Sequence, residues 1–143
     1  MAEDIRLGAI ALRFLHSKHD TGGALDMFEM TVEPRGRMPV PHYHRNWEET
    51  IYGIAGVLTM IVDGKTVEIG PGDSVFIPRG VVHGFDNHGT EPARCLCVLT
   101  PGVLGPDYFR ELRDTLAAGT PPDPATMVAI MQRHGLVPAP HRG

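Results

Sequence analysis

The feature that most constrains the fold is a series of short segments in which apolar and polar residues alternate, each bounded by glycine or proline. Alternation with a period of two is typical of β-strands that bury one face. The chain of 143 residues contains 17 glycines and 13 prolines, which suits many short strands joined by tight turns. About eight to ten such strands at close spacing predict a β-sandwich or a small barrel up to residue 101.

Several strands can be placed from their patterns. Residues 7–16 are predicted to form one strand, and residues 24–32 another that turns alternate side chains to opposite faces. Residues 57–69 predict a hairpin, because Asp63-Gly64 is a favoured pair for a type I′ turn. Further strands are expected at 74–78, 81–87 and 93–100.

The pattern becomes helical after residue 101. Residues 105–119 carry apolar side chains at helical spacing, and residues 123–135 begin with Asp123, a favoured N-cap, followed by Pro124. Two short helices with one apolar stripe each cannot form a domain alone. We therefore expect a barrel over residues 1–101 and a helical tail over residues 102–143 that packs on the barrel or on a partner subunit.

Charge and hydropathy exclude two classes of partner. The formal net charge of −4 argues against electrostatic binding of nucleic acid, which requires a basic surface. No apolar segment approaches the roughly 20 residues of a membrane-spanning helix. The first residues, MAEDIRLGAIALRF, lack the basic region and cleavage site of a secretory signal. A cytoplasmic location is the expectation.

The segment GRMPVPHYHRNWEE contains a candidate for metal binding. On a strand, His42 and His44 would share one face, since side chains alternate. A turn after His44 would bring Glu49 to the same point at the start of the next strand, whereas Glu48 would point the opposite way. Two imidazoles and a carboxylate suit a metal ion, and the alternative is a polar cluster without an ion. Five other histidines are expected at the surface: His16, His19, His88, His134 and His141.

Two longer motifs extend this pattern. The first, G-x5-H-x-H-x4-E-x6-G, is formed by Gly36, His42, His44, Glu49 and Gly56. The second, G-x5-P-x-G-x2-H-x3-N, is formed by Gly72, Pro78, Gly80, His83 and Asn87. With every spacing kept, these ten positions resemble the motif pair of the cupin superfamily, and the surrounding strands extend the resemblance across residues 5–100.

The resemblance implies an all-β fold, a small antiparallel β-barrel or jelly roll, here followed by two short C-terminal helices. It also implies four metal ligands: His42, His44, Glu49 and His83. Three imidazole nitrogens and one carboxylate oxygen suit one divalent transition metal ion, namely Fe, Mn, Ni, Co, Cu or Zn. Asn87 is expected to close a turn rather than to touch a substrate.

Cupins with this ligand set include dioxygenases, isomerases, decarboxylases and binding proteins, so the resemblance implies a range of functions. We expect a metal-dependent oxygenase, similar to the small quercetin-dioxygenase-like cupins, that acts on a small aromatic or enolic compound. Glu49 would be both the fourth ligand and the catalytic general base. The alternative is a non-redox isomerase or lyase, or a small-molecule-binding module without catalysis.

Four residues are expected to point inward like the ligands, because side chains alternate along strands, and these are the candidates for substrate binding. Plain core packing is the alternative for each of them. They are Phe28, Met30, Ile51 and Phe85. Trp47 falls in the expected turn, and Tyr43 alternates with the two histidines and so points the other way. An outer face or an interface is expected for both. Because cupins commonly dimerise through edge strands or tails, a homodimer is the expected assembly.

Overall fold

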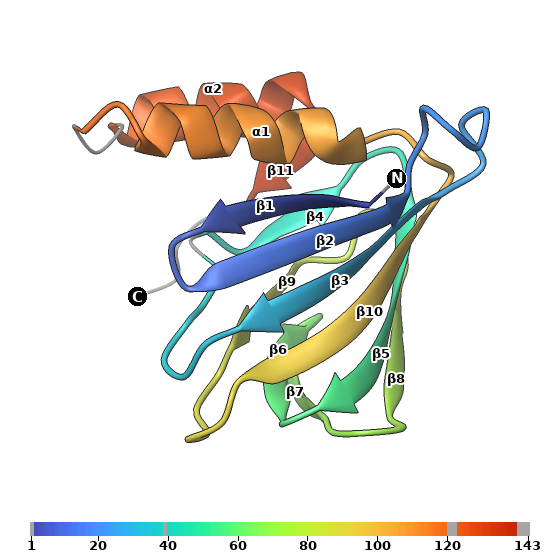
Figure 1. Ribbon diagram of the computed structural model, residues 1–143, viewed down its shortest axis with the longest axis vertical. Coiled ribbons are helices and arrows are strands. Elements are labelled where there is room, and N and C mark those ends of the chain that lie inside the picture. Colours follow the sequence, from blue (N-terminus) through green and yellow to red (C-terminus); the bar gives the residue numbers. More distant parts are fainter. Residues whose placement is uncertain (1, 39, 120–122, 140–143) are drawn as a thin grey trace.

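The computed structural model describes residues 2–38, 40–119 and 123–139, which form two β-sheets and two helices (Figure 1). The strands are β1 (Glu3–Leu7), β2 (Ile10–His16), β3 (Asp26–Val32), β4 (His42–His44), β5 (Glu48–Ala55), β6 (Leu58–Val62), β7 (Lys65–Ile69), β8 (Ser74–Ile77), β9 (His83–Asp86), β10 (Ala93–Thr100) and β11 (Leu136–Pro138). The helices are α1 (Gly105–Leu116) and α2 (Pro124–Arg133).

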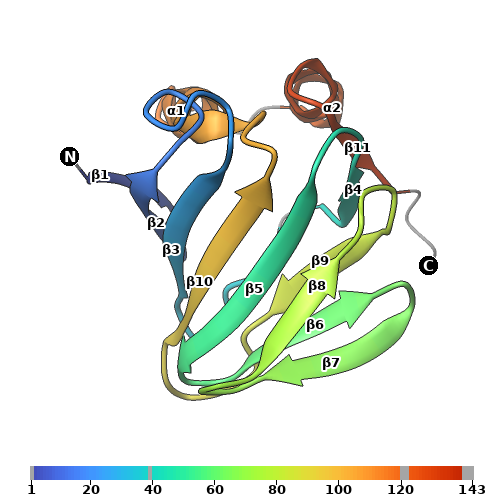
Figure 2. The same cartoon turned by 90° about the vertical axis from the view of Figure 1, so that its right-hand side faces the viewer.

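The two sheets are antiparallel and lie face to face. One has the strand order β1-β2-β3-β10-β5-β8, and the other has the order β11-β4-β9-β6-β7. Figure 2 shows the sheets splaying apart toward the helices, with α1 above the β1–β3 end of the first sheet and α2 above β4 and β11 of the second. The predicted all-β fold is confirmed as a jelly roll whose sheets do not close into a continuous barrel.

Local sequence accounts for most of these elements. Along β3 the buried and half-buried residues alternate strictly, as predicted, with Phe28, Met30 and Val32 on the buried face. The β6–β7 hairpin turns at Asp63 and Gly64, whose φ angles of 52° and 77° are both positive. A type I′ turn requires that conformation at both central residues, so this prediction is also confirmed.

Two predicted elements had wrong bounds, and one strand was not predicted. Residues 7–16 are not one strand, because Gly8 adopts a φ of 60° and turns the chain between β1 and β2. Helix α1 ends at Leu116, with Ala117 as its C-cap, three residues before the glycine that was expected to terminate it. Strand β11 was not predicted at all. The start of α2 is as expected, since the Asp123 carboxylate accepts a hydrogen bond from the Thr126 backbone N–H.

The C-terminal tail packs against both sheets of its own chain. Helix α1 contacts β1, α2 contacts β11, and β11 joins the second sheet beside β4. Among the described residues, neither helix has the length and apolar character needed to cross a bilayer. The tail therefore covers the wide end of the sandwich.

Candidate metal centre

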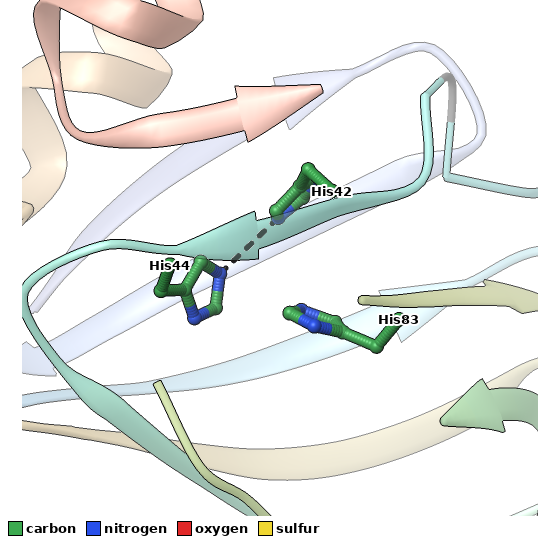
Figure 3. A group of neighbouring side chains, drawn as sticks. All are labelled: His42, His44 and His83. Carbon is green, nitrogen blue, oxygen red and sulfur yellow. Dashed lines mark hydrogen bonds between the residues drawn. The ribbon is translucent and has the colours of Figure 1, made fainter. Parts of the chain in front are cut away.

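Three histidines meet on the inner face of the second sheet (Figure 3). His42 and His44 are the buried ends of the three-residue strand β4, and Tyr43 between them is only half-buried. His42 pairs in register with His83, the first residue of β9. One ring nitrogen from each of the three histidines lies within 4.8 Å of the other two. The expected inward alternation along β4 is therefore present, and it brings these imidazoles together.

Glu49 approaches the histidines from the opposite sheet. After β4 the chain turns through residues 45–47 into β5, where Glu49 points inward and Glu48 points outward to an ion pair with Arg79. The Glu49 Oε1 atom lies 3.7 Å from His83 Nε2 and 3.9 Å from His44 Nε2. A single ion placed among these side chains would thus link the two sheets.

Backbone carbonyls orient two of the imidazoles for coordination. His42 Nδ1 donates a hydrogen bond to the Val40 carbonyl and His83 Nδ1 donates one to the Val81 carbonyl, both at 3.0 Å. Since a carbonyl only accepts, both Nδ1 atoms carry the proton and both Nε2 atoms present a lone pair to the site. Such a hydrogen bond on the outer nitrogen is the usual support of a metal-binding histidine.

The His83 Nε2 atom provides the test of whether a metal ion fits. It is buried and has no hydrogen-bond partner among the described residues. A buried acceptor without a partner costs free energy, so such atoms are rare in folded proteins. The His42 and His44 Nε2 atoms converge to 3.1 Å close to the same point. A cation there would satisfy all three nitrogens, and the residues present therefore fit a metal ion.

Burial sets the charge state of the metal-free cluster. It lowers the pKa of His42 to about 4 and the pKa of His44 to about 2, with the neighbouring His83 adding to both shifts. Burial lowers the pKa of His83 as well. The three imidazoles are thus neutral at pH 7, which is the form that binds metal. Burial raises the pKa of Glu49 to about 7, an effect opposed by a hydrogen bond from the Cys97 thiol.

The cluster lies in the wall of a cavity of about 370 Å³ between the two sheets and the helices. All eight residues predicted for metal and substrate binding line this cavity: Phe28, Met30, His42, His44, Glu49, Ile51, His83 and Phe85. The rest of its lining is apolar apart from Arg37 and Tyr108. A ligand would therefore meet polar atoms mainly at the histidine cluster.

Sequence reasoning missed the contribution of the helices to this cavity. Leu104, Tyr108 and Leu112 reach it from α1 and the residue before it, and Met131 reaches it from α2. The apolar stripes of both helices signalled a buried face, but the sequence did not indicate what that face would cover.

The expectation for Trp47 was wrong, because this residue lies at neither an outer face nor an interface. Its side chain is 0% exposed. The indole stacks on the imidazole of His44, with ring centroids 4.7 Å apart and planes inclined by 22°. Trp47 therefore belongs to the immediate surroundings of the histidine cluster.

The second motif shapes the approach to His83. Gly80 has a φ of 83°, and the Val81 N–H bonds to the Pro78 carbonyl, so the predicted tight turn before β9 is confirmed. Asn87 closes the following turn by accepting a hydrogen bond from the Gly89 N–H, as expected.

The remaining histidines lie apart from the cluster. His16, His19 and His88 are exposed, and His134 is half-buried beside Glu111. His141 lies outside the described residues.

Comparison with known proteins assigns the family. The family model for the cupin domain matches residues 28–99, which is half of the chain. This chain is a cupin. The match begins in β3 and ends in β10, so it contains the four candidate ligands. It does not include the α1, α2 and β11 segment of this cupin.

Relatives of this cupin differ in their described activities. Quercetin 2,3-dioxygenase of Bacillus subtilis is 39% identical over 83 residues, which cover 57% of this chain but only 23% of that enzyme. The structure of the polyketide cyclase RemF from Streptomyces resistomycificus is 30% identical with a TM-score of 0.61, over 69% of this chain and 73% of that chain. A predicted oxalate decarboxylase from Thermotoga maritima shares the fold, with 24% identity and a TM-score of 0.63 over 71% and 92% of the two chains.

Proposed function

We propose that this cupin binds one divalent transition metal ion through His42, His44, Glu49 and His83, and uses it to oxygenate a small aromatic or enolic compound. The observation that carries the proposal is the unpartnered His83 Nε2 atom, which faces two further imidazole nitrogens at the wall of an apolar cavity. The similarity of 83 residues to a quercetin 2,3-dioxygenase supports the oxygenase class.

The donor set defines the group that would be bound. Three neutral nitrogens and one carboxylate oxygen suit Fe, Mn, Ni, Co, Cu or Zn. When bound, such a metal would polarise a substrate oxygen and, for a redox-active ion, give molecular oxygen a route to the substrate. A purely structural zinc site has four protein ligands in tetrahedral array, whereas here the Glu49 Oε1 atom lies 3.7 Å and 3.9 Å from two of the histidine nitrogens, compared with 3.1 Å between the His42 and His44 nitrogens.

Glu49 would act as the general base. Its pKa near 7 in the metal-free protein shows how strongly burial favours the protonated acid. A carboxylate with this affinity for protons is suited to take a proton from a substrate hydroxyl through Oε1 and to return it later. The neighbouring Cys97 thiol opposes part of this rise in the pKa of Glu49.

The apolar walls would bind and orient the body of the substrate. Phe28 and Phe85 offer aromatic faces, and Met30 and Ile51 add aliphatic contact within the same cavity. These side chains would exclude water from the reacting end of the molecule.

A second candidate is a non-redox reaction on a similar substrate. The polyketide cyclase RemF is 30% identical to this cupin over a region that covers 69% of the present chain. Cyclisation or isomerisation would use the same polarised oxygen and the same base but consume no oxygen. The metal ligands and the cavity would have the same roles in both candidates.

The test combines elemental analysis with oxygen uptake. The purified protein should contain about one metal ion per chain, and His42→Ala should abolish it. Flavonols, catechols and β-diketones form the substrate panel, and a metal-dependent uptake that His42→Ala removes is expected. His88→Ala, which alters an exposed histidine, is the control. Substrate conversion without oxygen uptake would select the non-redox candidate, and a protein that retains no metal would refute both.

The homodimer is also a proposal. Many cupins oligomerise, and the outer strands β7 and β8 each leave one edge unpaired among the described residues. Light scattering on the purified protein should give twice the mass of the 15.6 kDa chain. A monomer across the accessible concentration range would refute this proposal without affecting the metal site.

A further inference from the structure

We propose that the C-terminal segment Gly135–Ala139 positions the metal ligands His42 and His44, so that metal affinity depends on residues outside the part of the chain that matches the cupin family. This inference rests on the proposed metal site. Two independent sets of contacts carry it, one through the backbone of β4 and one through the side chain of Trp47.

The first set of contacts fixes the strand that carries both histidines. Strand β11 pairs with β4 in antiparallel register, with Leu136 opposite His44 and Pro138 opposite His42. At one end the Arg45 N–H donates to the Gly135 carbonyl at 3.0 Å. At the other end the Ala139 N–H donates to the Pro41 carbonyl at 2.9 Å.

Strand β4 is paired over a shorter length with its other neighbour, β9, than with β11. It is three residues long, and its register with β9 consists of the single pair His42 and His83. Without β11, this short strand would be an edge strand held by that pair and by one hydrogen bond, which the Gly80 N–H donates to the His44 carbonyl at 2.9 Å. The C-terminal segment therefore supplies most of the backbone pairing that holds the two ligands in place.

The second set of contacts acts through Trp47. The indole stacks on His44 at 4.7 Å and is completely buried. Gly135 lies against the six-membered ring of this indole: a Cβ atom at Gly135 would be 3.1 Å from Cζ3 and 3.6 Å from Cη2. Glycine at this position thus lets the C-terminal segment approach the ring that supports His44.

The contacts of Trp47 are those of its ring rather than of its N–H group. Its Nε1 atom is buried without a hydrogen-bond partner among the described residues. Stacked aromatic rings hold each other in a preferred orientation. Trp47 is therefore a positioning residue for His44, and the C-terminal segment is a positioning element for Trp47.

Two glycine substitutions test whether the C-terminal segment affects metal binding, with Co²⁺ as the probe. Gly135→Ala adds a methyl group against the indole, whereas Gly119→Ala adds one where no atom lies within 4 Å. Both glycines have positive φ angles, 88° and 83°, so the backbone penalty is matched. Trp47 is the only tryptophan of the chain, and its fluorescence should be quenched when paramagnetic Co²⁺ binds beside His44.

We expect Gly135→Ala to weaken Co²⁺ binding by about tenfold or more, the range typical of groups that orient metal ligands. It should also change the ligand-field absorption of bound Co²⁺, which reports on ligand geometry. Gly119→Ala should bind Co²⁺ with the wild-type constant and spectrum. Equal affinities and spectra for the two variants would overturn this inference and leave the proposed metal site standing.

A second pair of variants covers the case in which Gly135→Ala does not fold. Trp47→Phe retains an aromatic ring beside His44, whereas Trp47→Leu does not, and competition with a chromophoric chelator measures Co²⁺ affinity in both. Trp47→Leu should bind more weakly than Trp47→Phe, and equal affinities would refute the role of stacking. Failure of the wild-type protein to bind Co²⁺ or any other divalent transition metal ion would instead remove the metal site itself.

Discussion

Replacing Glu49 by glutamine should stabilise the metal-free protein at alkaline pH while removing a metal ligand. The carboxyl group is buried between the sheets, and burial raises its pKa from 4.5 to about 7. Each pKa unit corresponds to about 1.4 kcal/mol. The ionised carboxylate therefore costs the folded, metal-free protein about 3 kcal/mol.

The direction of the pH dependence follows from proton binding. Between pH 4.5 and about 7 the folded protein holds a proton on Glu49 that the unfolded chain has released. Stability must therefore fall as the pH rises through this window and level off above it. Glutamine resembles the protonated acid and does not titrate. Since the histidines titrate equally in both proteins, the difference between them isolates Glu49.

Thermal denaturation in the presence of a chelator measures the effect. At pH 8 the Glu49→Gln variant should melt on the order of 10 °C above the wild-type protein, and at pH 4.5 the two should nearly coincide. The control is Glu48→Gln, since Glu48 points outward to Arg79 and that ion pair lowers its pKa. The melting temperature of this control should not exceed that of the wild-type protein at pH 8.

When metal is present, the wild-type protein should instead melt at a higher temperature than the Glu49→Gln variant. A metal ion at one thousand times its dissociation constant stabilises the folded wild-type protein by about 4.1 kcal/mol, which exceeds the roughly 3 kcal/mol cost of the ionised carboxylate. Glu49→Gln, which lacks a ligand, should gain less than about 1 kcal/mol. The reasoning would be refuted if Glu49→Gln changed the melting temperature by the same amount at both pH values. It would then follow that burial does not disfavour the Glu49 carboxylate.

Three further predictions concern single side chains. His83→Ala should abolish the rise in melting temperature that Zn²⁺ produces in the wild-type protein, because it deletes the unpartnered nitrogen; an unchanged rise would place the ion elsewhere. Ile51→Phe should reduce kcat/KM by filling the cavity that this residue lines, with metal content by elemental analysis unchanged; normal turnover would exclude this wall from substrate binding. Asn87→Ala should lower the free energy of unfolding in urea by about 2 kcal/mol or more, because its amide bonds to the carbonyls of Val32 and Glu91 at 2.9 Å. Its metal affinity should stay at the wild-type value, and a large loss there would contradict the assignment of Asn87 to the turn.

Local sequence determined the elements that depend on near neighbours in the chain. Alternation fixed which face of β3 is buried, and Asp63-Gly64 fixed the β6–β7 turn, because both follow from backbone geometry over a few residues. The spacing of His42, His44 and Glu49 was equally informative, since alternation and one turn suffice to point these side chains into the same space between the two sheets.

Boundaries were less predictable where the apolar pattern runs on past the end of an element. Residues 7–16 carry a continuous apolar pattern, and only the positive φ of Gly8 separates β1 from β2. Helix α1 ends before its expected glycine. In both cases the apolar pattern continues past the ending, so periodicity alone did not locate it.

Tertiary structure alone decided what surrounds the histidine cluster. Strand β11 has three residues and no local pattern of its own, so only its pairing with β4 defines it. The burial of Trp47 likewise depends on Gly135, which is distant in sequence and adjacent in space. The sequence by itself therefore indicated an all-β fold through its short-range periodicity, and the resemblance of its two motifs to those of cupins implied the family and the four candidate ligands. The support of His44 and the covering of the cavity depend on contacts between distant segments, which form only when the chain has folded.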